Sequence, residues 1–151
     1  MYTIRKLFKF EMAHQLSTAY STACSEQIHG HSYICEVFFK SDELDETGMV
    51  IDFGEVKALI GEYMDFWDHS LVMPSDMPKE YLKALTKYNK KLQIVPYNPT
   101  AEAMAKDMYY RIKKLMRGSA NPDIADKVYK VRLHETTTGY AEYEWCSSKT
   151  G

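Results

Sequence analysis

The chain has 151 residues, of which 45% are hydrophobic, which is enough for one domain with its own core and too few to favour two. Its 19 basic and 21 acidic side chains give a formal charge of −2. No basic run could follow a phosphate backbone, so nucleic acid is not an expected partner. No apolar stretch reaches the roughly 18 to 20 residues of a membrane span. We therefore expect a cytoplasmic, single-domain protein, residues 1–151, that binds neither membranes nor nucleic acid.

Two strands are predicted at the start of the chain. From Tyr2 to His14 most even positions carry apolar side chains, a period of two that is typical of a strand with one buried face. From His29 to Phe39 the odd positions read His, His, Tyr, Cys, Val and Phe, which again has a period of two. The segment that follows has the composition of a turn, so a second strand is expected to end there.

The middle of the chain predicts two main helices. Asp52 can cap a helix over about Phe53 to Trp67, where apolar residues recur at helical spacing. Thr100 can cap the second, whose apolar stripe stops at Gly118. Between them, proline residues break the pattern, and only a short lysine-rich helix is expected there.

Alternation returns in the last part of the chain. Residues 127–135 alternate, with Tyr129, Val131, Leu133 and Glu135 expected on one face, and a final strand is expected after Gly139. The order strand, strand, helix, helix, strand, strand predicts an α+β fold in which the helices cover one face of a sheet.

Three of the five histidines are expected to meet. His29 and His31 share the apolar face of the second strand, and His14 ends the apolar face of the first, with only fourteen residues between His14 and His29. If the two strands pair antiparallel, the rings converge, and three neutral imidazoles with an open fourth position are what a catalytic Zn²⁺ uses. The alternative is that each ring is a partly buried histidine bonded to a carbonyl, which is the commoner case for any one alone. Three such rings on converging apolar faces favour the metal.

Two residues just before the histidine pair are candidate bases. Cys24 lies in a polar loop where a thiol has no packing role, and a nearby Zn²⁺ would favour its thiolate. Glu26 competes with it for the role of general base. The simpler alternatives are a tolerated loop cysteine and a solvated loop carboxylate.

Two further features suggest acid/base or binding chemistry. Asp68 and His69 are adjacent, and a carboxylate can fix the tautomer of an imidazole, although a histidine at a helix end is ordinarily a surface group. Glu135 ends an otherwise apolar strand face, where a carboxylate is costly unless it is paired. A ligand with two parallel N–H groups would be a suitable partner, and the alternative is a strand-end glutamate that reaches water.

Six motifs occur in order along the chain: Phe10–His14, His29–Tyr33, Asp52–Phe53, Asp68–His69, Asn98–Glu102 and His134–Thr136. Together they resemble the 6-pyruvoyltetrahydropterin synthase and 6-carboxytetrahydropterin synthase family. The likeness covers nearly the whole chain except the stretch between about Pro74 and Tyr97. The occurrence of all six motifs in this order identifies the family far more specifically than any single motif does.

The resemblance implies a tunnelling fold (T-fold), an antiparallel four-stranded sheet with two main helices on one face. Trimers of this unit would pair into a homohexamer whose barrel interfaces hold the active sites. The implied zinc ligands are His14, His29 and His31. The implied enzyme is a zinc-dependent lyase that acts on 7,8-dihydroneopterin triphosphate, with zinc as Lewis acid and template.

The resemblance also assigns roles to other residues. Cys24, Asp68 and His69 resemble the proton-transfer group, and Glu135 resembles the carboxylate that grips the pterin ring. The secondary pocket residues of the family are matched by Thr100, Glu102 and Thr136.

The product is the point on which this chain departs from the family pattern. Four residues separate Cys24 from His29, one more than in members that resemble the carboxy enzyme of queuosine biosynthesis and one fewer than in the pyruvoyl enzymes. The run from Glu26 to His31 also matches the Glu-x-x-His-Gly-His variant, which releases a hydroxymethyl pterin. We expect the 6-carboxy product, with the pyruvoyl and hydroxymethyl products as alternatives. Outside the family, a three-histidine zinc hydrolase and a non-catalytic binding module remain open.

Overall fold

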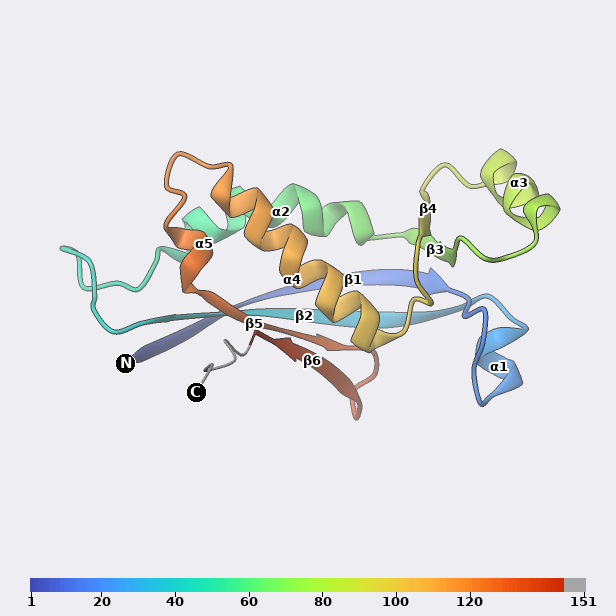
Figure 1. Cartoon of the computed structure of the whole chain (residues 1–151), viewed down its shortest axis with the longest axis horizontal. Helices are drawn as coiled ribbons and strands as arrows, with labels where there is room; N and C mark the ends of the chain where they lie inside the picture. The colour runs from blue at the N-terminus through green and yellow to red at the C-terminus, as the bar shows by residue number, and fades with distance from the viewer. Residues whose placement is uncertain (146–151) are drawn as a thin grey trace, which may run out of the picture.

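A computed structural model describes residues 1–145 of the chain (Figure 1). Its strands form one six-stranded sheet in the order β4-β3-β1-β2-β5-β6. The strands are β1 (Tyr2–His14), β2 (His29–Ser41), β3 (Ser70–Pro74), β4 (Leu92–Val95), β5 (Val128–His134) and β6 (Tyr140–Glu144). The helices are α1 (Thr22–Ser25), α2 (Phe53–Trp67), α3 (Lys79–Tyr88), α4 (Ala101–Arg117) and α5 (Ile124–Lys127).

The four predicted strands are present and pair antiparallel, β1 with β2, β2 with β5, and β5 with β6. Two short strands were not predicted: β3 runs parallel to β1, and β4 runs parallel to β3. Every residue of β3 is buried, so this strand lacks the alternation by which the others were recognised. The sheet therefore has six strands, two more than expected.

The two main helices lie on the same side of the long strands β1 and β2 (Figure 1). The Asp52 side chain caps α2 by accepting from the backbone N–H groups of Gly54 and Glu55. Thr100 caps α4 in the same way through the N–H of Ala103, and Gly118 ends that helix. The helix α3 stands apart from α2 and α4, at the end of the molecule where β1 ends.

The core lies between the helices and one face of the sheet. The even positions of β1 and the odd positions of β2 point into it, as predicted, and Phe10, Met12 and Tyr33 are among its buried residues. The face expected for β5 was partly wrong. A bulge pairs Phe39 with Val128, which leaves Tyr129 outside the pairing. Tyr129 consequently contacts the ring of Phe38 rather than joining the core.

No helix in the described part of the chain, residues 1–145, has both the length and the apolar character needed to cross a membrane.

Candidate active site

The pairing of β1 with β2 brings the three predicted metal ligands together. His14 lies directly opposite His29, and His31 pairs with Met12 two residues further along. The ring centroids of His14 and His29 are 4.5 Å apart, and those of His29 and His31 are 5.0 Å apart. One nitrogen from each of the three rings lies within 4.8 Å of the others. Three imidazoles so arranged could hold a metal ion and leave a fourth position open.

Two backbone carbonyls orient these rings. The Nδ1 of His14 lies 2.9 Å from the carbonyl oxygen of Pro99, and the Nδ1 of His29 lies 3.1 Å from that of Gln27. A carbonyl can only accept, so each Nδ1 carries the proton and each Nε2 keeps a free lone pair. This is the support that metal-binding histidines usually have. Burial, with smaller effects of His29 and His31, lowers the pKa of His14 to about 4, although the bond to Pro99 opposes the shift. The ring is therefore neutral, as a ligand must be.

Glu135 lies beside the histidines. One of its carboxylate oxygens is 3.7 Å from Nε2 of His14 and 3.9 Å from Nε2 of His31. The hydroxyl of Tyr33, a residue only 1% exposed, also reaches this group and lies 3.5 Å from both ring nitrogens of His14. Burial, with a smaller effect of the Glu135 charge, raises the pKa of Tyr33, so its hydroxyl stays protonated beside the histidines.

A cavity of about 330 Å³ opens beside this group. Six predicted site residues line it: His14, Cys24, His29, Thr100, Glu102 and Glu135. They come from β1, α1, β2, the start of α4 and the end of β5. A small ligand in this cavity would touch the histidines, a thiol and two carboxylates at once.

The loop that carries Cys24 is held by bonds to the end of β1. The Gln15 side chain donates to the carbonyl of Ser25 at 2.7 Å, and the backbone N–H of Leu16 donates to the carbonyl of Cys24 at 3.0 Å. Glu26 lies at the exposed C-terminal end of α1, and it is not among the described residues that line the cavity. Of the two candidate bases, Cys24 is the one with access to the metal site.

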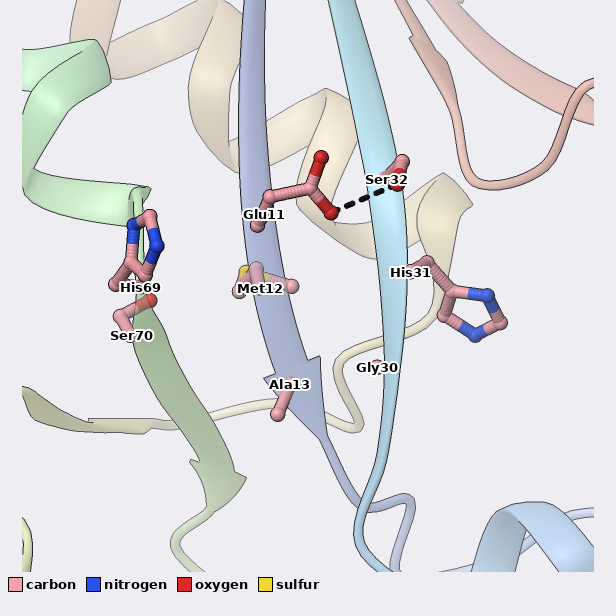
Figure 2. A pocket seen from close by; sticks show the side chains of 8 residues that line it. All are labelled: Glu11, Met12, Ala13, Gly30, His31, Ser32, His69 and Ser70. Carbon is pink, nitrogen blue, oxygen red and sulfur yellow. Dashed lines mark hydrogen bonds between the residues drawn. The ribbon is translucent and has the colours of Figure 1, made fainter.

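Asp68 and His69 lie elsewhere in the chain. His69 lines a different cavity of about 390 Å³, which it shares with His31 of the histidine cluster and with the exposed residues Glu11 and Ser32. Figure 2 shows the His69 ring on one side of β1, whereas the His31 ring extends beyond β2 on the other. Within one chain the structure therefore does not join the Asp68–His69 pair to Cys24.

Hydrogen bonds hold the Asp68–His69 pair in place. The Asp68 carboxylate accepts from the backbone N–H of Glu11 at 2.8 Å and lies 2.8 Å from Nδ1 of His69. The bond from Glu11, more than the bond from His69, holds the pKa of Asp68 below its usual range. His69 has a φ of 57°, a left-handed conformation that is uncommon for residues other than glycine and often marks functional sites. Its side chain is 77% exposed, and among residues 1–145 its ring is hydrogen-bonded only through Nδ1, to Asp68.

Thr136, a predicted pocket residue, is not among the residues that line the 330 Å³ cavity. Its hydroxyl accepts from the backbone N–H groups of Thr138 and Gly139 and so shapes the turn between β5 and β6. Gly139 itself lines the cavity, so Thr136 contacts a residue of the cavity wall rather than the cavity itself.

Two residues of the candidate site, Tyr33 and Pro99, were not predicted from the sequence. Tyr33 was placed on the apolar face of the second strand, and its position two residues after His31 on that face is the signal that could have identified it. Pro99 supplies only a backbone carbonyl, which no side-chain pattern reveals.

The fold and the three converging imidazoles together define a class, the T-fold pterin synthases. A sequence model of the 6-pyruvoyl tetrahydropterin synthase family matches residues 3–146. The chain belongs to this family.

Individual relatives agree with this assignment. A 6-carboxy-5,6,7,8-tetrahydropterin synthase from Helicobacter pylori is 32% identical over 141 residues, which cover 92% of this chain and 70% of that protein. The Aquifex aeolicus protein of the same name is 34% identical, over 93% of this chain and 96% of that protein. The solved structure of the Caenorhabditis elegans 6-pyruvoyl tetrahydropterin synthase is 26% identical, with a TM-score of 0.65 over 96% of both chains. The expected T-fold is thus confirmed.

Proposed function

We propose that this protein is a 6-carboxy-5,6,7,8-tetrahydropterin synthase, a zinc-dependent lyase that acts on 7,8-dihydroneopterin triphosphate. The observation that carries the proposal is the single cavity in which His14, His29, Cys24 and Glu135 meet. The relatives from Helicobacter pylori and Aquifex aeolicus, at 32% and 34% identity, support the carboxy product over the alternatives.

Glu135 is the proposed anchor of the pterin ring. Its carboxylate is partly exposed and lines the cavity. The two oxygens can accept a pair of parallel N–H groups, such as a pterin presents on one ring edge. This contact would place the side chain of the pterin over the three histidines.

His14, His29 and His31 would hold the proposed Zn²⁺, each through one ring nitrogen. When bound, the ion supplies Lewis-acid chemistry that polarises the substrate's side-chain hydroxyls and makes neighbouring protons more acidic. Cys24, which shares the cavity, is the proposed base that removes such a proton. Thr100 and Glu102 complete the wall of the cavity.

Asp68 and His69 are proposed to serve the cavity of a neighbouring copy of the chain. The strand β3 pairs with β1 only at Met12 to His14, so most of one edge of β1 has no strand partner among residues 1–145, and β6 is the opposite edge of the sheet. Open edges of this kind join copies of a chain into a continuous sheet. In such a homo-oligomer the exposed imidazole of His69 can reach a substrate that Cys24 of another copy contacts.

The test is to incubate the purified protein with dihydroneopterin triphosphate and to identify the pterin and the carbon fragment by mass. A carboxypterin with acetaldehyde is the expected result. A pyruvoyl or a hydroxymethyl pterin would contradict the proposed product.

A variant of Glu135 separates this function from that of a three-histidine zinc hydrolase, which has no need of the carboxylate. We expect Glu135→Ala to weaken pterin binding at least tenfold, because hydrogen bonds to a charged group are worth about 1.5 to 3 kcal/mol, and to leave the metal content unchanged. Fluorescence titration with a dihydropterin measures the affinity. Glu62→Ala, which alters an exposed glutamate on α2 outside the cavity, is the control. Unchanged affinity in Glu135→Ala would favour the hydrolase.

A further inference from the structure

A third cavity, of about 580 Å³, lies on the far side of His69. It is bounded by the end of β1, the start of β3 and the segment that links α3 to β4. It shares Ala13, His69 and Ser70 with the cavity of Figure 2. His69 therefore stands where two hollows on the same surface meet.

The side chains around this third cavity favour an anion. Half of the described residues that line it are apolar or aromatic, and the other half are Lys90, Lys91 and the polar residues His69, Ser70 and Asn89, with no carboxylate among them. The surrounding segment, residues 79–91, has five lysines and one glutamate, a net charge of +4 in a chain whose formal charge is −2. Positive charge is thus concentrated beside the cavity while the rest of the chain is acidic.

The two lysines differ in how they are held. The ammonium of Lys91 donates to the carbonyl oxygens of Asp65 and Asp68 at the end of α2, which fixes one positive charge next to His69. Lys90 is exposed and makes no hydrogen bond or ion pair with any residue in the described range 1–145. Its ammonium is free to bind a ligand that enters the cavity.

We propose that this cavity is a polyphosphate subsite, in which Lys90 and Lys91 receive the triphosphate of the substrate. The inference rests on the proposed function and extends it. If Glu135 holds the pterin and His69 of a neighbouring copy meets the side chain near the metal, the phosphate end of the substrate lies beyond His69. That is where the carboxylate-free cavity and its two ammonium groups are found.

Calorimetric titration with inorganic tripolyphosphate tests the subsite without any catalysis. We expect wild type to bind it and Lys90→Gln to bind it roughly tenfold more weakly, since a charge-assisted contact is lost. Lys83→Gln is the matched control, because it makes the same charge change on α3 outside the cavity, and it should bind like wild type. Equal affinity in all three proteins, or equal weakening in both variants, would overturn the subsite.

A second titration separates this inference from the proposed function. Lys90→Gln should weaken binding of dihydroneopterin triphosphate about tenfold and leave binding of unphosphorylated dihydroneopterin unchanged. Equal weakening of both ligands would contradict the subsite. If wild type binds neither pterin, the proposed function fails, and the tripolyphosphate titration still decides whether the cavity is an anion site.

Discussion

Backbone carbonyls fix the proton position on two of the three histidines. Pro99 and Gln27 accept from the Nδ1 atoms of His14 and His29, which leaves the Nε2 lone pair of each ring available to a metal ion. Burial of His14 works in the same direction, because it disfavours the charged ring. Its surroundings thus prepare His14 as a neutral ligand before any ion binds.

Because His14 is buried, we expect the free energy of unfolding of the metal-free protein to depend on pH. Its pKa is lowered from 6.5 to about 4 in the folded state, so below pH 6.5 the unfolded chain takes up a proton on this residue that the folded chain does not. The contribution of neutral His14 to the free energy of unfolding is therefore fully present above pH 6.5. It is lost as the pH falls toward 4, and the total loss is about 3 kcal/mol.

Urea denaturation of metal-free wild type and His14→Gln at pH 7 and pH 4.5 measures this effect. The free energy of unfolding of wild type should fall more than that of the variant, because other titrating groups are common to both. Equal decreases in the two proteins would show that His14 is not responsible.

At the scale of single elements, one residue both caps α4 and lines the cavity. Thr100 accepts from the N–H of Ala103 and also lines the cavity. Thr100→Ala should lower the free energy of unfolding by about 1 kcal/mol, whereas Thr100→Ser, which keeps the hydroxyl, should stay close to wild type. Denaturant titration of the three proteins is the measurement. A Thr100→Ala variant as stable as wild type would show that the cap contributes nothing.

The main elements could be predicted because their signals are local. A capping aspartate and apolar residues at helical spacing defined α2 from Phe53 to Trp67, the bounds found in the structure. The strands β3 and β4 escaped prediction because one is wholly buried and the other has only four residues. The bulge at Tyr129 also escaped, since it depends on the pairing with β2 rather than on the sequence of β5.

The candidate site, like the fold, could be predicted where its residues are close in the sequence pattern of one strand. Residues that share a strand face, such as His29 and His31, were brought together as expected. The separation of His69 from Cys24 could not be predicted, because it depends on which face of the sheet each segment reaches. Sequence motifs show that residues occur together in a family and do not show whether they meet within one chain.

At the scale of the whole molecule, the separated residues and the open sheet edges point to a site shared between copies. Cys24→Ala and His69→Ala should each lower turnover at least tenfold. When the two variants are unfolded together and reassembled, about a quarter of the sites should combine an intact Cys24 with an intact His69 if copies pair at random. Turnover by the mixture well above that of either variant is the expected result. A mixture no more active than the two variants alone would place both residues in the site of one chain.

The most direct test of the account is to count metal ions. Elemental analysis of wild type, His31→Ala and His134→Ala should find one zinc per chain in wild type and in His134→Ala, whose altered histidine is bonded to Glu36 outside the cluster. His31→Ala should retain well under half of that amount. A wild-type protein that never retains the ion, or a His31→Ala variant that retains it fully, would contradict the metal centre on which the proposed chemistry depends.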